Sequence, residues 1–267
     1  MSSHAISDQE FTAISQFFFA ESGIRLGANK RSLVCGRLAP RLKALEMERY
    51  GDYLAFISSD RNQVERHMAV DLLTTNETYF FREMRHFNFL QQLLEQKWPG
   101  HVPQIWSAAC SSGEEPYSIA MMLAEHLGDS AWQVDASDLS GRMLDTAAQG
   151  LYPLSRARDM PSGFLKKYCL KGLGAYEGYL LIDEALKRRV HLRSHNLMEP
   201  VQSTKKYDLI FLRNVLIYFD AEGKRKIIQH LVKVLQPDGY LFVGHSESLN
   251  GITDQLVPVR PAVYRLA

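Results

Sequence analysis

The chain has 267 residues, 46% of them hydrophobic, which is enough for a sizeable core and two domains. The formal net charge of +1 excludes a general attraction to nucleic acid or to an anionic membrane. The three cysteines lie far apart without a CxxC pair, so we expect neither a disulfide framework nor a metal site. Met1 to His4 lack the basic and apolar character of a signal peptide, and no apolar run approaches the ~20 residues of a membrane span. We therefore expect a cytoplasmic protein.

The first 75 residues predict an all-helical domain. Ser7 and Glu10 have the spacing of a capping box, and Gly23 ends the helical apolar pattern that follows. Residues 74–82 interrupt the helical pattern. Further helices are expected over residues 30–47, 53–58, 62–73 and 84–98.

After residue 100 the pattern alternates between strand and helix. Strands are expected over residues 102–107, 132–136, 207–212 and 240–243. Helices are expected over residues 114–127, 141–149 and 224–235. This alternation predicts an α/β fold with a doubly wound, mostly parallel sheet. The tail, residues 256–266, contains prolines and suits an antiparallel edge strand.

Between residues 151 and 192 the alternation fails. This stretch is rich in Gly, Tyr, Lys and Arg, and short strands are predicted at residues 168–170, 179–182 and 190–192. We interpret it as a small β-subdomain inserted into the α/β fold.

The loop after the first predicted strand, residues 107–116, is the first place to look for a ligand, because ligands of doubly wound sheets bind at the carboxyl ends of the strands. Gly113 is its only glycine, so a dinucleotide fingerprint is absent. Glu114 and Glu115 would repel a pyrophosphate but suit an ammonium group. The alternative is an ordinary helix start, where acids are also favoured.

Polar residues also follow the other predicted strands. Asp138 ends the second strand and could accept hydrogen bonds from ribose hydroxyls, or cap the next helix. Asn196 follows a strand-like segment and could bind a purine edge or occupy an ordinary turn. Arg213 and Asn214 interrupt an apolar run at a strand end, where packing alone would favour apolar residues. Residues 74–82 could form a lid over a ligand or a domain linker.

Taken together, these segments resemble the CheR family of chemotaxis receptor glutamate methyltransferases. The specific motifs are Gly-Glu-Glu-Pro-Tyr-Ser at residues 113–118 and Arg-Asn-Val-Leu-Ile-Tyr-Phe at residues 213–219. The family's other segments follow in the right order along nearly the whole chain. They are residues 74–83, 136–138, 196–197 and 235–247.

The resemblance implies a class I S-adenosylmethionine-dependent methyltransferase fold, with an N-terminal all-helical domain and an inserted small antiparallel β-subdomain. It places a helical receptor-recognition domain at residues 1–75, a linker and first catalytic helix at 76–100, and the methyltransferase domain at 101–267. The inserted subdomain would cover about residues 152–192. The product would be S-adenosylhomocysteine.

The resemblance also assigns site residues. Arg82 and Tyr218 would be catalytic, Glu115 and less directly Glu114 would hold the cofactor's ammonium group, and Asp138 would bind its ribose. The remaining predicted cofactor-binding residues are Asn76, Thr78, Arg82, Asn196, Leu197, Leu212, Arg213 and Asn214.

Substrate recognition is predicted at two places. Lys30, Arg37 and Arg41 are spaced to share one helix face, which is usually a solvated face. The resemblance favours contact with acidic receptor helices instead. Gly172 and Gly174 lie in a loop that resembles the one on which some family members dock a receptor's C-terminal peptide, although glycines also simply form tight turns.

The expected partners are therefore chemoreceptor cytoplasmic domains and a receptor C-terminal peptide, with no nucleic acid, no membrane insertion and a monomeric enzyme. A nucleic-acid methyltransferase is the second enzyme hypothesis, but residues 213–216 lack the prolines of the usual amino-methylation motif. A non-catalytic, cofactor-binding receptor adaptor is the non-enzyme alternative. A dehydrogenase is disfavoured because the glycine fingerprint is absent.

Overall fold

The computed structural model describes residues 5–267, so the segment Met1 to His4, in which no signal peptide was recognised, lies outside the described residues. The chain divides into two compact units, residues 1–75 with Tyr218–Asp220, and residues 76–217 with 221–267. None of the helices formed by residues 5–267 has both the length and the apolar character needed to cross a bilayer.

The first unit contains four helices among its described residues: α1 (Asp8–Ser22), α2 (Arg31–Ala44), α3 (Tyr50–Ser58) and α4 (Gln63–Leu73). The predicted capping box is present, because the Ser7 hydroxyl accepts from the Glu10 amide while the Glu10 carboxylate accepts from the Ser7 amide. Gly23 ends α1 in the left-handed conformation, with φ of 74°. Such a conformation favours glycine. The buried face of α2 is formed by Val34, Leu38 and Leu42, whereas Cys35 is half-buried.

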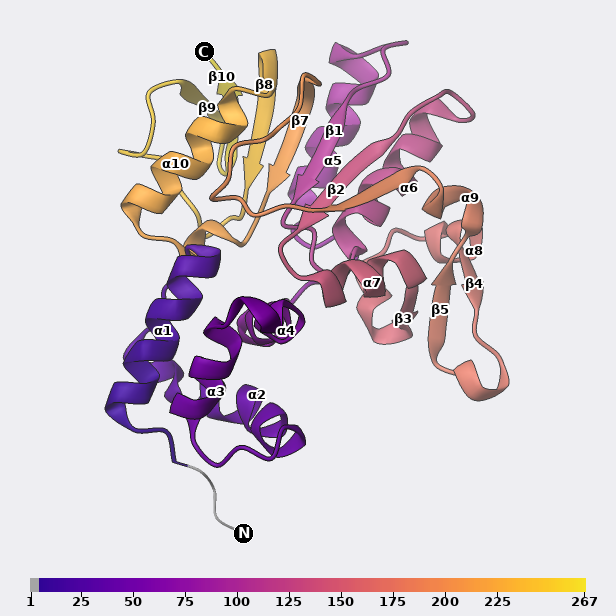
Figure 1. Cartoon of the computed structure of the whole chain (residues 1–267). Helices are drawn as coiled ribbons and strands as arrows, with labels where there is room; N and C mark the ends of the chain where they lie inside the picture. The colour runs from indigo at the N-terminus through magenta and orange to yellow at the C-terminus, as the bar shows by residue number, and fades with distance from the viewer. Residues whose placement is uncertain (1–4) are drawn as a thin grey trace. The chain divides into compact units, whose positions relative to one another are not determined.

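The second unit is built on a seven-stranded sheet (Figure 1). The strands follow the order β6-β2-β1-β7-β8-β10-β9. Their bounds are β1 (Ile105–Ala108), β2 (Val134–Asp138), β6 (Val190–Ser194), β7 (Tyr207–Leu212), β8 (Leu235–Val243), β9 (Leu256–Arg260) and β10 (Val263–Leu266). Strands β6, β2, β1, β7 and β8 pair in parallel, whereas β10 is antiparallel to both β8 and β9. The predicted doubly wound, mostly parallel sheet is therefore confirmed, and the tail forms a hairpin of two strands rather than the single expected strand.

Four main helices accompany this sheet. They are α5 (Met84–Gln92), α6 (Glu114–Leu127), α7 (Gly141–Gln149) and α10 (Ala221–Val232). Residues Leu93–Lys97 continue α5 as a π-helix. The sheet is apolar throughout its centre, where Trp106, Phe211 and Phe242 are fully buried, so it is a rigid platform for the loops at its strand ends.

A smaller antiparallel sheet is inserted between α7 and β6, and it lies apart from the large sheet in Figure 1. Its strands are β3 (Leu151–Pro153), β4 (Cys169–Lys171) and β5 (Tyr179–Ile182), in the order β3-β5-β4, and two short helices accompany them, α8 (Phe164–Tyr168) and α9 (Glu184–Lys187). The assignment of residues 190–192 to this sheet was wrong. They begin β6, which pairs in parallel with β2, and Leu151–Pro153 supplies the third strand instead.

Candidate active site

The carboxyl ends of β1, β2 and β7 lie next to one another, because these strands are neighbours in the parallel part of the sheet. The loop after β1 turns sharply, with left-handed φ values of 62° at Ala109, 49° at Ser111 and 97° at Gly113. Non-glycine residues in this conformation are strained and often mark functional sites. A side chain at Gly113 would bring its Cβ within 2.7 Å of the Ala147 Cβ, so glycine is required here for packing.

Asp138 connects the loop after β1 to the end of β2. Its buried carboxylate accepts hydrogen bonds from the Ser111 amide at 2.7 Å and the Ser140 amide at 2.9 Å. The cap of α7 is provided by Ser140, whose hydroxyl accepts from the Met143 amide. Ser140 therefore caps α7 in place of Asp138. The Asp138 carboxylate instead orders the loop after β1 in the candidate site.

The two adjacent acids of this loop have different partners. Glu115 accepts from the Ser107 hydroxyl at 2.6 Å and from Arg213 Nη1 at 3.0 Å. Glu114 is 1% exposed. It accepts from the Ser112 hydroxyl at 2.6 Å and lies 3.5 Å from Arg156 Nη1.

Burial raises the pKa of both carboxyls above the usual value, although the positive charge of Arg213 opposes this at Glu115 and that of Arg156 opposes it at Glu114. Of the two acids, only Glu115 is bonded to a residue at the end of β7.

Arg213 is the central cation of the site. Its side chain is 2% exposed, and it forms ion pairs at 3.0 Å with both Glu115 and Glu83. It also donates to the Arg82 carbonyl. The rings of Phe87 and Phe211 flank the guanidinium at 5.7 and 6.0 Å. The Arg213 side chain is therefore held by two carboxylates, a backbone carbonyl and two aromatic rings.

Asn214 follows with a left-handed φ of 57°. Its backbone amide donates to Glu247 and its side-chain amide donates to Glu83. Glu247 also accepts from the amides of Gly244 and Ile217. At Gly244 a Cβ would lie 2.5 Å from the Asn214 side-chain nitrogen, so a glycine is required beside this asparagine.

The segment before α5, residues 76–83, is bonded to other parts of the second unit at several points. The Asn76 carbonyl accepts from the Ser111 hydroxyl at 3.2 Å, and the Thr78 carbonyl accepts from Arg156. The Phe81 amide donates to the Ser118 hydroxyl at 2.9 Å. Residues 76–83 thus form part of the candidate site rather than a solvated linker.

Arg82 folds back on its own segment. Its Nη1 donates to the Glu77 carbonyl at 2.7 Å, and its guanidinium lies 5.9 Å from the centre of the Tyr79 ring. No hydrogen bond from its side chain to an acid is among the interactions described for residues 5–267, and its catalytic role stays a prediction.

The remaining predicted cofactor contacts follow β6 and β7. Leu212 is fully buried at the end of β7, and Leu197 is buried after β6. The Asn196 side chain accepts from the Met198 amide at 3.0 Å, which is the turn geometry considered as its alternative function. A carbonyl–amide side chain has further donors and acceptors beyond this one bond.

Tyr218 ends a short 3-10 helix, Leu216–Tyr218, and groups with the first unit. There its carbonyl accepts from the Arg25 amide at 3.3 Å. Its catalytic role stays a prediction.

The basic residues of α2 mostly serve the first unit itself. Arg41 pairs with Glu65 through two hydrogen bonds of 2.8 and 2.6 Å, and Arg37 donates to the carbonyls of Leu73 and Thr74. Lys30 precedes α2 and is exposed. The three residues therefore do not form one uniform solvated face, since two of them connect α2 to α4 and to the residue after it.

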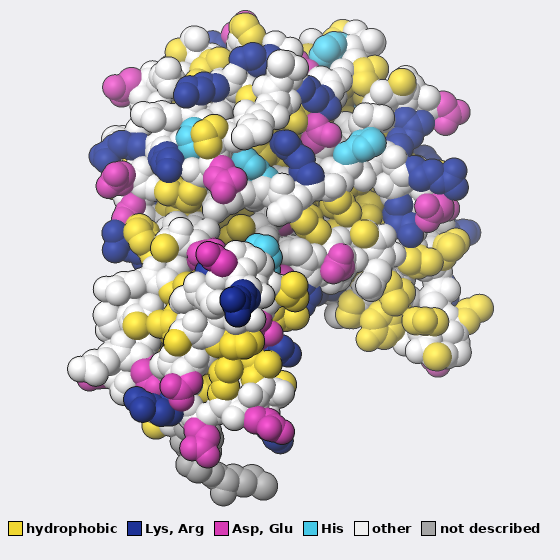
Figure 2. All heavy atoms as spheres, viewed as in Figure 1, with side chains coloured by type: hydrophobic (Ala, Val, Ile, Leu, Met, Phe, Trp, Pro, Cys, Tyr) yellow, Lys and Arg dark blue, Asp and Glu magenta, His cyan; other side chains and the backbone are white. Residues whose placement is uncertain are grey.

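The Gly172–Gly174 loop joins β4 to a 3-10 turn at the tip of the small sheet. The Gly172 amide donates to the Tyr179 carbonyl, and a Cβ there would lie 2.0 Å from the Tyr176 carbonyl oxygen. Hydrophobic side chains are exposed around it, and Figure 2 shows a patch of them at this end of the molecule. They include Leu170, Leu173, Tyr176 and Tyr179.

Two functional-site features were missed in the sequence. Glu83 and Glu247 are acids that hold Arg213 and Asn214, and both fall in segments that carry the family resemblance.

Glu83, His86 and His245 each offer one ligand atom, and these three atoms lie within 4.8 Å of one another, a spacing that would permit metal binding. Because the Glu83 carboxylate already accepts from Arg213 and Asn214, we assign it to anchoring these side chains rather than to a cation.

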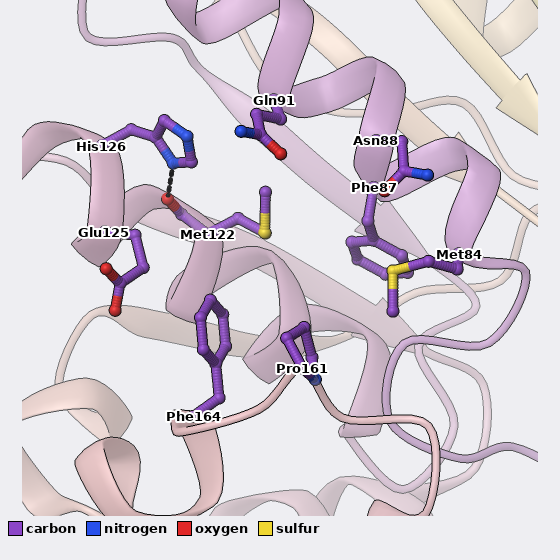
Figure 3. A pocket seen from close by; sticks show the side chains of 9 residues that line it. All are labelled: Met84, Phe87, Asn88, Gln91, Met122, Glu125, His126, Pro161 and Phe164. Carbon is purple, nitrogen blue, oxygen red and sulfur yellow. Dashed lines mark hydrogen bonds between the residues drawn. The ribbon is translucent and has the colours of Figure 1, made fainter.

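A separate pocket of about 450 Å³ lies among α5, α6 and the start of α8 (Figure 3). Three of its polar side chains are engaged. His126 is bonded to the Met122 carbonyl, Glu125 accepts from Lys167 and Tyr168, and Gln91 donates to Glu95. Within residues 5–267, none of the predicted site residues lines it. We assign it no part in the chemistry.

Comparison with known families decides what this arrangement belongs to. Residues 9–74 match the family described as CheR methyltransferase, all-alpha domain, and residues 76–264 match CheR methyltransferase, SAM binding domain. The chain belongs to the CheR methyltransferase family. The resemblance recognised in the sequence is thereby confirmed, and so is the class I methyltransferase fold with S-adenosylmethionine as the cofactor.

Relatives in this family match almost end to end. The chemotaxis protein methyltransferase of Salmonella typhimurium is 38% identical over 98% of this chain and 92% of its own length. Chemotaxis protein methyltransferase 2 of Pseudomonas aeruginosa is 39% identical over 96% of this chain and 92% of its own length. The Escherichia coli relative is 37% identical, covering 98% and 92%. This CheR-family chain is therefore an S-adenosylmethionine-dependent methyltransferase of the chemotaxis type.

Proposed function

We propose that this enzyme esterifies glutamate side chains on the cytoplasmic helices of chemoreceptors. The observation that carries the proposal is the arrangement of Asp138 at the end of β2, Glu115 at the start of α6 after β1, and Arg213 after β7, in a chain whose relatives are chemotaxis protein methyltransferases. Because these receptor helices are cytoplasmic, we expect the enzyme to lie in the cytoplasm. We expect it to act as a monomer.

The site residues fit a cationic cofactor. Glu83, Glu115 and Arg213 together carry two negative charges and one positive charge, so the cluster has one net negative charge. We propose that Glu115 binds the cofactor's ammonium group and Asp138 its ribose. A carboxylate has about four acceptor positions, which leaves capacity beyond the two backbone amides that Asp138 binds. Asn76, Thr78, Asn196, Leu197, Leu212 and Asn214 would complete the binding site.

The acceptor needs no general base. A glutamate side chain has a pKa of about 4.3 in water, so its carboxylate is ionised at neutral pH. The cofactor supplies a methyl group on a positively charged sulfur. A carboxylate oxygen attacks the methyl carbon, the O–C bond forms as the C–S bond breaks, and the bond's electron pair stays on sulfur. The products are a methyl ester and S-adenosylhomocysteine, with no proton transferred.

The protein's own contribution is alignment and exclusion of water, and orientation alone can supply on the order of 7–11 kcal/mol. We propose that Arg82 and Tyr218 orient the incoming carboxylate. A tight ion pair would weaken the nucleophile. The guanidinium of Arg82, which donates to the Glu77 carbonyl of its own segment, suits a lighter contact.

Receptor recognition is proposed for two surfaces. The first unit, with Lys30 exposed beside α2, would contact acidic receptor helices, where charge complementarity aids encounter and register. In the inserted subdomain, β4 is an edge strand. It contains the exposed Leu170, and the exposed Leu173 follows it. A receptor's C-terminal peptide would add there as a further strand, raising the effective enzyme concentration near its targets.

The test is methyl transfer to receptor-containing membranes from methyl-labelled S-adenosylmethionine. Label on receptor bands that is released as methanol by mild base supports carboxyl methylation, and receptors without their C-terminal tail test the peptide contact. Label that resists base would indicate nitrogen methylation. Cofactor binding without any label would favour an adaptor.

A further inference from the structure

Glu83 is a carboxylate that the reaction does not use directly, yet it is the meeting point of three segments. It is the last residue of the segment 74–83 and precedes α5, and its backbone is left-handed with φ of 58°. A glutamate in this conformation is strained, so the surrounding contacts must hold it there.

Those contacts come from the ends of two strands. The Glu83 carboxylate accepts from Arg213 Nη2 at 3.0 Å and from the Asn214 side chain at 3.1 Å, both after β7. After β8, the His245 amide donates to it at 3.2 Å. The Glu83 side chain is only 15% exposed, so these bonds are shielded from water and therefore effective.

Glu83 is ionised under ordinary conditions. Burial raises its pKa, but the neighbouring His86, Arg213 and Asn214 outweigh burial and hold the pKa well below its usual range. His86 lies 3.4 Å away, and burial lowers the pKa of this histidine. Arg213 is thus the close cation that Glu83 and Glu115 have in common.

We propose that Glu83 is a positioning residue of the cofactor site: it holds Arg213 and Asn214 in place and draws the Arg213 guanidinium partly away from Glu115. Glu115 thereby keeps enough negative charge to bind the cofactor's ammonium group. Without Glu83, Arg213 would neutralise Glu115 completely and compete with the cofactor. This inference rests on the proposed binding of the ammonium group by Glu115.

The experiment measures the affinity for S-adenosylmethionine by calorimetry at pH 8. Glu83→Gln removes the charge and retains the shape, and should weaken binding on the order of tenfold. The double variant Glu83→Gln with Arg213→Gln restores the net charge and should recover part of the affinity that Glu83→Gln loses. Glu83→Asp, which keeps the charge, should bind to within about threefold of the parent.

Asp135→Asn is the matched control, because Asp135 is also a largely buried carboxylate of this unit that is paired with a cation, Lys205 at 2.7 Å. It should leave the affinity unchanged. Thermal unfolding of each variant shows that it is folded, and Glu83→Asp alone tests the role of charge if the double variant does not fold.

The outcomes separate this inference from the proposed site. If Glu115→Gln fails to weaken binding, the proposed ammonium site is wrong. If Glu115→Gln weakens binding but Glu83→Gln does not, only the role of Glu83 is wrong. Equal losses in Glu83→Gln and Glu83→Asp, or a further loss in the double variant, would show that shape rather than charge matters and would also overturn the inference.

Discussion

Nη1 of Arg213 lies 3.0 Å from a carboxylate oxygen of Glu115, although 98 positions separate the two residues in the chain. This ion pair joins the start of α6, which follows β1, to the residue after β7. It therefore links the segments that follow two neighbouring strands of the sheet. An ammonium group that binds Glu115 must share this carboxylate with Arg213.

The first prediction concerns the amino-acid end of the cofactor. Glu115→Gln should weaken S-adenosylhomocysteine binding by about tenfold, or 1.4 kcal/mol, because the ammonium group loses its charged partner. Binding of 5′-methylthioadenosine, which lacks that group, should not change. Calorimetry with both ligands checks this, and equal losses for both would contradict the assignment.

The second prediction concerns the ribose. Asp138→Asn should weaken both ligands by about 1.5–3 kcal/mol, as expected for hydrogen bonds to a charged group, since both contain the ribose. The same calorimetry distinguishes the effect of Asp138→Asn from that of Glu115→Gln, because only Asp138→Asn should weaken the binding of 5′-methylthioadenosine. A loss confined to S-adenosylhomocysteine would place the ribose elsewhere.

The third prediction concerns the Arg41–Glu65 pair in the first unit. The hydrogen bonds from Arg41 lower the pKa of Glu65 more than burial raises it. A carboxyl whose pKa is lower in the folded state than in the unfolded state stabilises the folded protein at pH values above the unfolded-state pKa. This stabilisation is lost as the pH falls through the folded-state pKa. Glu65→Gln should therefore cost about 1.5–3 kcal/mol at pH 7, and the difference from the parent should shrink below about pH 4.3.

Urea unfolding followed by circular dichroism measures this difference. Trp98, Trp106 and Trp132 all lie in the second unit, so their fluorescence reports on that unit as an internal control. A deficit that stays constant from pH 7 down to pH 3 would show that the charge of Glu65 is not responsible.

The fourth prediction concerns peptide docking. Gly172→Ala should distort the loop after β4, because its Cβ would collide with the Tyr176 carbonyl. Methylation of receptors with a C-terminal tail should fall to the level seen for tailless receptors, while cofactor affinity stays unchanged. Gly100→Ala is the control, since a Cβ at Gly100 meets open space, although its φ is positive. Full tail-dependent activity in Gly172→Ala would exclude this loop from docking.

The fifth prediction concerns the proposed orientation of the acceptor. Tyr218→Phe should lower kcat by about 100-fold, the scale of a small misplacement of reacting groups, with less than about a threefold change in cofactor affinity. Rapid-quench turnover and calorimetry measure the two quantities. A loss of affinity equal to the loss in kcat would make Tyr218 a cofactor-binding residue.

The sheet could be predicted from the sequence because apolar segments alternated regularly with amphipathic helices, and motif spacing placed Asp138 and Arg213 at strand ends. The strand at residues 190–192 was assigned to the wrong sheet because a short apolar segment does not reveal its partner. Pairing with β2 depends on contacts more than 50 residues apart in the chain, such as Asp135 with His191.

The partners of charged side chains could not be predicted from the sequence. Helical spacing puts Arg37 and Arg41 near each other, but their bonds to Leu73, Thr74 and Glu65 depend on how α4 packs against α2. Glu83 was missed for the same reason. A strained backbone and three donors from remote strand ends leave no local pattern, only an acid between Arg82 and Met84.

The small sheet begins after α7 and returns to β6, so it lies within the connection between the neighbouring parallel strands β2 and β6. An insertion with this topology can vary during evolution without changing the strand order of the catalytic sheet. Its fixed attachment points are Tyr152, which donates to the Ser112 carbonyl at 2.7 Å, and Arg156, which is bonded to Thr78. A chimeric enzyme that keeps these two residues and exchanges the outer strands should therefore acquire a new receptor preference while retaining the donor's catalytic machinery.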